Sequence, residues 1–395
     1  MRIALVAEHA RPLAATTSGA VGGQSIHVAS LARALVHRGN DVTVFTGRTE
    51  AERPPRLLTS SGYVLESPPE QARSRPSFAG YLERRLANDH HDVVHAHFWT
   101  SGVAAMRCRA ALGIPVVQTF HGLGVVARRH LHGVNPGPPQ RIGVEARLCA
   151  SADQVIAMSS AEAFELRRLG LDAARTSIVP SGVDIATFVA SPPAYRPVGP
   201  RRVLVVSGLA PGNGIDDAIR AVRDLRDVEL VVAGGPESAV DLVRDPEARR
   251  LSSVASVCGV RHRVRFLGAV DRRGVARLMA TADAVVATPW YEPFGMVALE
   301  AMASGVPVVA TAVGGMIDSV VDGVTGVLVP PRDPDAVAAA LRRVLGDPSF
   351  SSRLGRAGAE RARRTYSWDC VARGALGAYA RARGDERVDR DVDED

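Results

Sequence analysis

The sequence contains no lysine, so each of its 48 basic residues is an arginine. A replacement that covers the whole chain indicates a bias in genome composition and not a chemical role at particular sites. Cysteine is scarce as well, since the four cysteines lie far apart and no Cys-x-x-Cys pair occurs. Zinc sites need closely spaced ligands, so we expect four reduced thiols and no metal centre.

Long apolar runs are also missing. No stretch approaches the roughly 20 apolar residues that a membrane-spanning helix requires. The first apolar run covers residues 3–7, whereas the apolar part of a signal peptide has about 7–15 residues. We therefore expect a cytoplasmic protein that is neither exported nor anchored.

Nucleic-acid signatures are absent too, because the chain has no zinc-finger spacing, no RNA-binding aromatic motif and no basic helix with interleaved aromatics. The net charge of +6 is nevertheless uneven: residues 384–395 hold seven acids and two arginines, so that 2 − 7 = −5. This segment is predicted to be a disordered acidic tail. The rest of the chain then has a net charge of +11, since 6 + 5 = 11. This positive charge suits an anionic ligand such as a nucleotide, and it allows weak peripheral contact with an acidic membrane.

The chain of 395 residues divides into two halves of similar size. In each half, short apolar runs typical of buried parallel strands alternate with segments of helical periodicity, which predicts an α/β fold with doubly wound sheets. Residues 191–200 hold four prolines and predict a linker between domains at 1–190 and 201–365. The expected strands are 2–7, 41–45, 92–95, 116–120, 154–158, 203–206, 229–233, 264–266, 284–287 and 306–310.

The most informative motif is Glu292-Pro-Phe-Gly-Met-Val-Ala-Leu-Glu300, which follows the predicted strand at 284–287. We expect Glu292 in a loop, a helix that begins near Gly295, and Glu300 at its second turn. A glycine at a helix N-terminus lets an anion approach the free N–H groups, so the first amides of this helix are expected to bind phosphate. The carboxylate of Glu300 is expected to accept hydrogen bonds from ribose hydroxyls.

The two glutamates that flank Pro-Phe-Gly resemble those of the retaining glycosyltransferases of family four, which have the GT-B fold: two facing doubly wound Rossmann-like domains with a cleft between them. The resemblance covers residues 1–375, and within the family the chain is similar to the actinobacterial glycosyltransferases of sugar or cyclitol phosphates and to sucrose-phosphate synthases. The other matching segments are Asp92-Val-Val-His-Ala-His97, Thr119-Phe-His-Gly122, Val179-Pro-Ser-Gly-Val-Asp184 and Asp322-Gly-Val-Thr-Gly-Val-Leu-Val329.

The resemblance implies a nucleoside diphosphate sugar in the second domain, a small-molecule or glycan acceptor in the first, and a helix at 366–383 that crosses back to the first domain. Glu292 would contact the transferred sugar, and His121 would lie beside the anomeric centre. Such enzymes keep the anomeric configuration without a metal or cofactor, and helix dipoles stabilise the leaving phosphate. The implied donor-binding residues are Gly22, Gly23, Phe294, Gly295, Met296, Val297 and Glu300.

One stretch departs from the family pattern. The family has Gly-Arg-Leu-x-x-x-Lys-Gly after the first strand of the second domain, whereas this chain has Gly208 and Asn213 in place of the arginine and the lysine. Each charge-assisted phosphate contact is worth about 1.5–3 kcal/mol, so both losses matter for an anionic donor. Three explanations remain open: another arginine such as Arg272 or Arg273 replaces them, the donor is unusual, or the protein is a weakened or non-catalytic relative.

The acceptor side is expected to carry arginines. The stretch that ends at Arg141 and is followed by Glu145 resembles one in relatives that act on sugar or cyclitol phosphates. Arg128, Arg129 and Arg141 would bind an acceptor phosphate as bidentate forks, unless they are ordinary solvated side chains.

Two histidines also point to the cleft. His95 and His97 occupy alternate positions at the end of a predicted strand, so both lie on one face, where they serve hydrogen bonding within the fold or contact the acceptor.

The sequence therefore predicts a retaining GT-B glycosyltransferase. A sugar-nucleotide epimerase and a non-catalytic partner protein are the alternatives. An oxidoreductase is disfavoured because no Gly-x-Gly-x-x-Gly follows either first strand.

Overall fold

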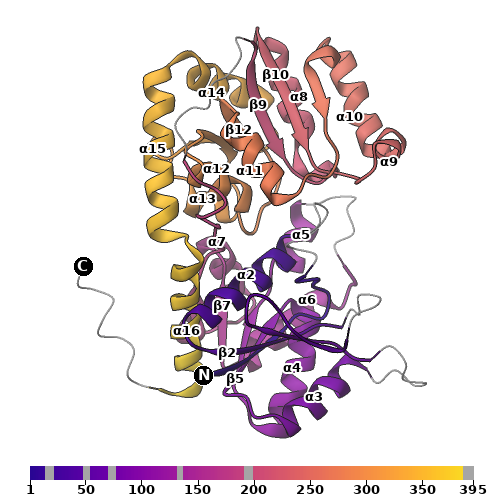
Figure 1. Ribbon diagram of the computed structural model, residues 1–395, viewed down its shortest axis with the longest axis vertical. Coiled ribbons are helices and arrows are strands. Elements are labelled where there is room, and N and C mark those ends of the chain that lie inside the picture. The colour runs from indigo at the N-terminus through magenta and orange to yellow at the C-terminus, as the bar shows by residue number, and fades with distance from the viewer. Residues whose placement is uncertain (14–21, 48–53, 70–76, 131–136, 191–198, 386–395) are drawn as a thin grey trace.

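Two α/β domains lie one above the other, with the last two helices running along one side of both (Figure 1). The computed structural model describes residues 1–13, 22–47, 54–69, 77–130, 137–190 and 199–385. Residues 191–198 and 386–395, which hold most of the expected linker and tail, lie outside the described residues. No helix within the described residues is long and apolar enough to cross a membrane.

The first domain is built on an eight-stranded sheet of order β3-β4-β2-β1-β5-β6-β7-β8. All neighbouring pairs are parallel except β3 with β4. The central strands are buried runs of Val, Ile and Ala, as expected for a sheet that helices cover on both faces. The strands are β1 (Arg2–Val6), β2 (Asp41–Phe45), β3 (Arg56–Leu58), β4 (Val64–Glu66), β5 (Val93–His97), β6 (Val116–Thr119), β7 (Gln154–Ala157) and β8 (Thr176–Ile178).

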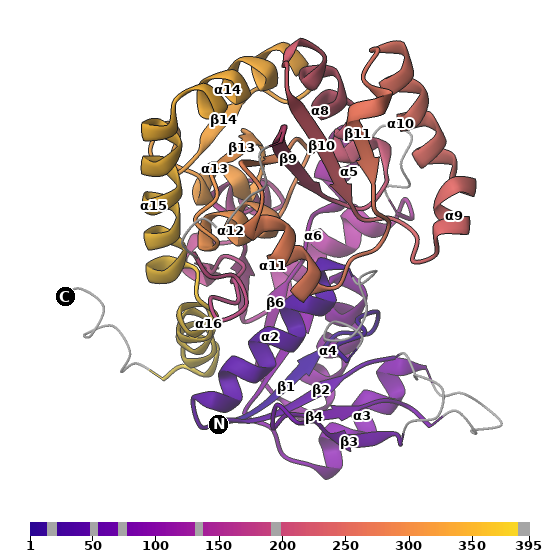
Figure 2. The same cartoon turned by 45° about the horizontal axis from the view of Figure 1, so that its top comes forward.

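Helices connect these strands and leave their N-termini at the carboxyl ends of the sheet, which is the edge that faces the second domain (Figure 2). Ser77 and Ser159 cap two of the helices by accepting hydrogen bonds from the amides of Gly80 and Glu162. The helices are α2 (Gly23–His37), α3 (Phe78–Asn88), α4 (Trp99–Leu112), α5 (Gly124–His130), α6 (Arg141–Ser151) and α7 (Ser160–Arg168), with a 3-10 turn at Ala173–Arg175.

The second domain has a six-stranded, fully parallel sheet of order β11-β10-β9-β12-β13-β14. Its strands are β9 (Arg201–Val206), β10 (Val228–Ala233), β11 (Val264–Phe266), β12 (Ala284–Ala287), β13 (Val308–Thr311) and β14 (Val327–Val329). Its helices are α8 (Ile215–Ala221), α9 (Ala239–Arg244), α10 (Pro246–Val257), α11 (Arg272–Ala280), α12 (Met296–Ala303), α13 (Gly315–Ser319), α14 (Pro334–Gly346) and α15 (Pro348–Thr365), with 3-10 turns at Pro211–Asn213, Val222–Asp224 and Arg261–Arg263.

The last helix, α16 (Trp368–Arg383), leaves the second domain and packs on the first, against α2 and strands β5 to β8. Ser367 caps it by accepting a hydrogen bond from the amide of Cys370. The fully buried Tyr379 hydroxyl lies 2.8 Å from Nδ1 of His95, so the helix is bound to the sheet by a polar contact within an apolar interface.

The predicted fold class is confirmed, since both sheets are doubly wound and follow the expected rhythm. Strands β2, β11 and β12 have the expected bounds, and β5 ends two residues later than expected, at His97. The short strands β3, β4, β8 and β14 were not among the expected ones. They lie at or next to the edges of their sheets, where runs of three residues have little apolar periodicity.

A close helix contact in the second domain is testable. Gly355 of α15 packs on the backbone that follows α12, and a Cβ atom there would clash with the carbonyl oxygen of Gly305. We expect Gly355→Ala to destabilise the native state by about 1–3 kcal/mol. Gly346→Ala in α14, where a Cβ meets no atom within 4 Å, is the control and should leave the melting temperature unchanged or raise it. Equal effects of the two substitutions would contradict this packing.

Candidate functional site

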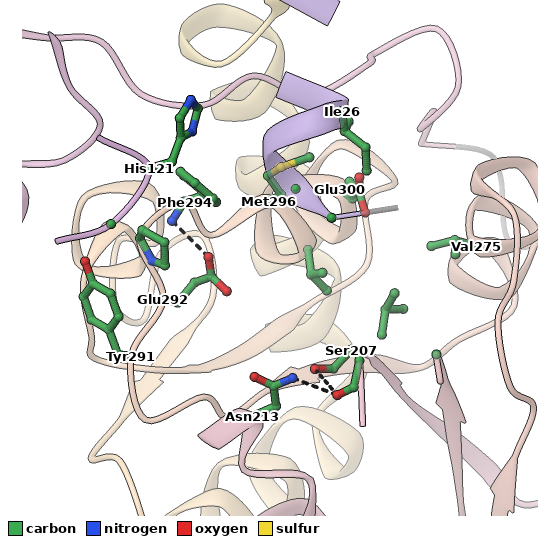
Figure 3. Close-up of a pocket in the computed structure, with 18 of the residues that line it drawn as sticks. Ile26, His121, Ser207, Asn213, Val275, Tyr291, Glu292, Phe294, Met296 and Glu300 are labelled. Carbon is green, nitrogen blue, oxygen red and sulfur yellow. Dashed lines mark hydrogen bonds between the residues drawn. The ribbon is translucent and has the colours of Figure 1, made fainter. Parts of the chain in front are cut away.

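A cavity of about 760 Å³ lies between the carboxyl ends of the two sheets, and both domains line it. Figure 3 shows the second-domain residues at its floor and His121 at its rim. The lining residues are Gly22, Gly23, Ile26, Phe98, His121, Gly122, Leu123, Ala127, Arg141, Phe188, Val206, Ser207, Gly208, Asn213, Ala233, Gly234, Gly235, Val270, Arg272, Val275, Tyr291, Glu292, Pro293, Phe294, Met296, Val297 and Glu300.

Glu292 organises the loop that leads into α12. Its Oε1 accepts hydrogen bonds from the amides of Phe294 at 2.9 Å and Gly295 at 3.2 Å. Gly295 caps the helix with a φ of 67°, a conformation that glycine adopts without strain. Burial raises the pKa of the Glu292 carboxyl, and the two amide donors oppose that rise. The carboxylate thus uses one oxygen to hold the loop and has a second oxygen for a ligand.

Two glycines let this loop pack closely. Gly314 has a φ of 48°, and a Cβ atom on it would clash with the carbonyl oxygen of Glu292. That same oxygen accepts a hydrogen bond from the amide of Gly315 at 2.9 Å. Gly314 and Gly315 are therefore needed for the close approach of α13 to the Glu292 loop.

Glu300, in α12, is buried and pairs with Arg272 of α11 at 2.8 Å. Burial raises the pKa of Glu300, and the charge of Arg272 lowers it. The guanidinium of Arg272 also stacks on the ring of Phe188 at 5.0 Å. These contacts fix a cation and an anion side by side on the wall of the cavity.

The departure from the family pattern is visible in the same wall. The side-chain amide of Asn213 donates to the carbonyl oxygen of Gly208 at 2.7 Å, so the Asn213 side chain is bonded within its own loop (Figure 3). Among the residues that line the cavity, the arginines are Arg141 and Arg272, and each is paired with a glutamate. Arg273 is exposed and is not among the lining residues.

The first domain meets this wall with the N-terminus of α2. A Cβ atom on Gly23 would lie 3.6 Å from the Phe294 ring and from the sulfur of Met296, whereas one on Gly22 would meet nothing within 4 Å. The amides that begin α2 and those that begin α12 thus approach each other across the cavity. Both helix ends carry partial positive charge, which favours an anion between them.

His121 lies in the loop after β6 with a φ of 57°, an uncommon value for a residue other than glycine. Its ring packs edge-on against Phe294 at 5.4 Å, and in Figure 3 Phe294 lies between it and Glu292. Behind the loop, the buried Glu162 of α7 accepts hydrogen bonds from the amides of Gly122 at 3.3 Å and Met158 at 2.7 Å. Glu162 therefore holds the His121 loop from the first-domain side.

Four histidines pack together beneath the rim: His27, His95, His97 and His121. His95 bonds Tyr379 at 2.8 Å and Thr119 at 2.9 Å, and His97 bonds His121 at 2.8 Å. Burial lowers the pKa of His27 to about 4 and that of His95 to about 3, so these rings are neutral. Within the described residues, no group of histidine, cysteine or acidic side chains is arranged to hold a metal ion.

The three arginines expected to bind the acceptor are separated by the structure. Arg141 lines the cavity, where it donates to Glu145 and to the carbonyl oxygen of Gly122, each at 2.6 Å. Arg128 and Arg129 are exposed and are not among the lining residues. The guanidinium of Arg129 is instead paired with Glu165 at 2.7 Å on the outer surface.

The comparisons with known proteins agree with this architecture. Residues 192–361 match the family described as glycosyl transferases group 1, and residues 21–187 match glycosyltransferase family 4. A D-inositol 3-phosphate glycosyltransferase of Xylanimonas cellulosilytica is 36% identical, over 96% of this chain and 97% of the relative. This chain belongs to the group 1 glycosyltransferases. The predicted GT-B fold and the prediction of a glycosyltransferase are thereby confirmed, whereas retention of the anomeric configuration stays a prediction.

Other relatives of this group 1 glycosyltransferase are similar over nearly their full length. A D-inositol 3-phosphate glycosyltransferase of Kineococcus radiotolerans is 33% identical, with 99% of this chain and 98% of the relative covered. The structure of sucrose-phosphate synthase from Thermosynechococcus elongatus has a TM-score of 0.86 at 29% identity, with 96% and 98% covered. Anabaena HepE in complex with UDP and glucose has a TM-score of 0.78 at 20% identity, with 96% and 99% covered, which shows the fold alone.

The roles of two residues of the site, Glu162 and Glu145, were not predicted. Glu162 binds the amide of Met158 four residues before it and that of Gly122 in a distant loop, and Glu145 was noted only as a neighbour of Arg141. A buried glutamate has no signature in a single sequence, because its partners are main-chain groups. The pairing of Arg272 with Glu300 was also missed, although the arginine itself was considered as a replacement cation.

The pH dependence of stability tests the Glu162 contact. Burial raises the pKa of Glu162 from 4.5 to about 7. Because the native state then binds more protons than the unfolded chain, this group makes the free energy of unfolding fall as the pH rises from about 4.5 to 7, by about 3 kcal/mol at most. Glu162→Gln should flatten that part of the melting-temperature profile. Glu165→Gln, on the same helix, is the control. An unchanged slope in Glu162→Gln would contradict the assignment.

Proposed function

We propose that the protein transfers a sugar from a nucleoside diphosphate sugar to a hydroxyl of a small-molecule or glycan acceptor, with retention of anomeric configuration and without a metal. The single observation that carries this proposal is the second-domain wall, where Glu292, the N-terminus of α12 and Glu300 follow one another along the cavity. The names of the relatives support transfer to a sugar-like hydroxyl, and the HepE complexes support a nucleotide sugar as donor.

In this proposal each part of the donor has a partner. Glu300 accepts hydrogen bonds from the ribose hydroxyls, and the free oxygen of Glu292 accepts one from a hydroxyl of the transferred sugar. The amides of Met296 and Val297, together with the start of α2 at Gly22 and Gly23, face the diphosphate. Fixed N–H groups of this kind stabilise charge that develops on a leaving phosphate without reorganisation.

The transfer step needs no side-chain base. The bond between the anomeric carbon and the diphosphate oxygen breaks while the acceptor oxygen bonds to the same face of the sugar. The proton of the acceptor hydroxyl passes to the departing phosphate oxygen, so charge and atoms balance. Closure of the two domains around both substrates excludes water and holds the acceptor oxygen close to the anomeric carbon.

The acceptor is proposed to bind against the first-domain wall, near Arg141. Among acceptors, a cyclitol phosphate should be tried first, because the relatives are named D-inositol 3-phosphate glycosyltransferases. Arg128 and Arg129 could contribute only if they turned inward from their exposed positions. The epimerase and the non-catalytic partner are not favoured by the relatives.

Binding of the donor is the first test. We expect one of UDP, GDP, ADP or TDP, or its glucose conjugate, to raise the melting temperature, because a ligand at about 100 times its Kd stabilises the native state by roughly 2.7 kcal/mol. Glu300→Gln should reduce the shift, since its carboxylate would accept bonds from the ribose. If none of these ligands shifts the melting temperature, the proposed donor class is wrong.

Arg272 is proposed to supply the cation that Gly208 and Asn213 lack. We expect Arg272→Gln to weaken binding of the nucleoside diphosphate at least tenfold, while Arg273→Gln, at the exposed neighbour, changes it less than threefold. The double variant Gly208→Arg with Asn213→Lys should restore affinity in the Arg272→Gln background, because a Cβ atom on Gly208 has no neighbour closer than 3.9 Å. Unchanged affinity in Arg272→Gln would exclude this role.

A further inference from the structure

Tyr291 joins the two domains at the edge of the cavity. It belongs to the second domain and directly precedes Glu292. Its side chain nevertheless packs against an apolar cluster of the first domain that includes Phe120, Leu123 and Val126. Within the described residues, every other member of that cluster comes from the first domain. The ring of Tyr291 therefore contributes to the core of the domain to which it does not belong.

The ring of Tyr291 lies between two main-chain segments, one from each domain. A Cβ atom added to Gly122 would lie 4.0 Å from Cε1 of the ring, and one added to Gly314 would lie 3.5 Å from Cε2. Gly122 directly follows His121, whereas Gly314 packs on the Glu292 loop. Opposite edges of one ring thus contact the loop of His121 and the support of Glu292. In Figure 3 the side chain extends from the Glu292 loop toward the first-domain loop that carries His121.

Both of these segments are fixed by hydrogen bonds within their own domains. The amide of Gly122 donates to the buried carboxylate of Glu162 at 3.3 Å. The amide of Gly315 donates to the carbonyl oxygen of Glu292 at 2.9 Å. Burial raises the pKa of the Tyr291 hydroxyl, and the nearby carboxylates of Glu162 and Glu292 raise it further, so the ring stays neutral. A rigid, neutral ring between two fixed segments can act as a spacer.

A second set of contacts holds the domains together beside this ring. The ring of His130, the last residue of α5, stacks on that of Tyr291 at an angle of 13°, with centroids 6.2 Å apart. The carbonyl oxygen of His130 accepts a hydrogen bond at 3.3 Å from Arg332 of the second domain. The guanidinium of Arg332 also stacks on the ring of Trp290, the neighbour of Tyr291, at 4.1 Å. The end of α5 is therefore held next to the loop that leads into Glu292.

We infer that Tyr291 is a positioning residue: its ring sets the distance between Glu292 and His121 where the two domains meet. In the proposed reaction Glu292 contacts the transferred sugar and His121 lies beside its anomeric carbon, so this consequence rests on the proposed function. The placement of the ring between the domains does not. A displacement of about 1 Å at the reacting groups can lower a rate about 100-fold. Loss of the spacer should therefore reduce turnover more than binding of the nucleotide.

Two substitutions separate the ring from its hydroxyl, because Tyr291→Phe keeps the spacer and Tyr291→Ala removes it. The probe is whichever of UDP, GDP, ADP or TDP raises the melting temperature, together with its glucose conjugate. We expect Tyr291→Ala to lower kcat for release of the nucleoside diphosphate from that conjugate at least tenfold. The Kd of the nucleoside diphosphate should change less than threefold, because its proposed partners are Glu300 and the first amides of α12. Tyr291→Phe should stay within threefold of the wild type in both constants.

The control is Tyr81→Ala in α3. Tyr81 is also a partly buried tyrosine, but its hydroxyl bonds Glu66 at 3.0 Å and it is not among the residues that line the cavity. This variant should have a lower melting temperature and leave both constants within threefold. A role of Tyr291 in stability alone would make Tyr291→Ala behave like Tyr81→Ala. Equal losses in Tyr291→Phe and Tyr291→Ala, or nucleotide binding weakened as much as turnover, would also contradict the spacer.

Hydrogen exchange followed by mass spectrometry tests the placement of the ring without any ligand. We expect Tyr291→Ala to speed amide exchange in the first-domain segment 119–130, whereas Tyr291→Phe and Tyr81→Ala leave that segment as in the wild type. A change confined to the second domain would overturn the inference, whatever the kinetics show. If the wild-type protein binds no nucleoside diphosphate, the proposed function fails, while the exchange data still decide whether the ring holds the His121 loop.

Discussion

The packing of α16 on the first domain is the contact on which the arrangement of the site depends. This helix belongs to the second half of the chain, yet it lies against α2 and the strands β5 to β8. Through Tyr379 and His95 it is bound to the same strand that ends at His97. The helix therefore restricts how the carboxyl ends of the two sheets face each other, and the cavity exists because both edges are held opposite one another.

Buried carboxylates hold the main chain in place at this edge of the two sheets. Glu145, Glu162 and Glu292 each accept hydrogen bonds from loop amides, and Glu300 accepts one from an arginine. Burial alone would favour their protonated forms, and the raised pKa values reflect that cost. In exchange, these hydrogen bonds fix the main-chain geometry of the loops that line the cavity. Such loops lack the periodic hydrogen bonds that order helices and strands, so side-chain acceptors have to supply them.

The central strands and the motif from Glu292 to Glu300 could be predicted from the sequence. A buried strand requires a run of apolar residues, and the backbone conformation at the start of α12 favours a glycine, so both leave a local pattern. The resemblance to GT-B glycosyltransferases implied the cleft, and its position agrees with the rule that ligands bind at the carboxyl ends of parallel strands. It could not separate Arg141 from Arg128 and Arg129. An arginine that lines a cavity and one that points to solvent differ only in the direction of the helix face, and an arginine-rich chain offers no contrast between them. The shared bond of His97 and His121 depends on a register between two strands that no local pattern encodes.

The hydrogen bond between Asp318 and the start of α7 has a consequence for how the cleft opens. Asp318 belongs to α13 of the second domain, and its carboxylate accepts from the amide of Ser160 at 2.6 Å and from its hydroxyl at 2.5 Å. An acid from one domain thus accepts from the first amide of a helix in the other, next to the Ser159 cap. Separation of the domains breaks this hydrogen bond and leaves the Ser159 cap in place. The hydrogen-exchange rate of the Ser160 amide therefore depends on how often the two domains part.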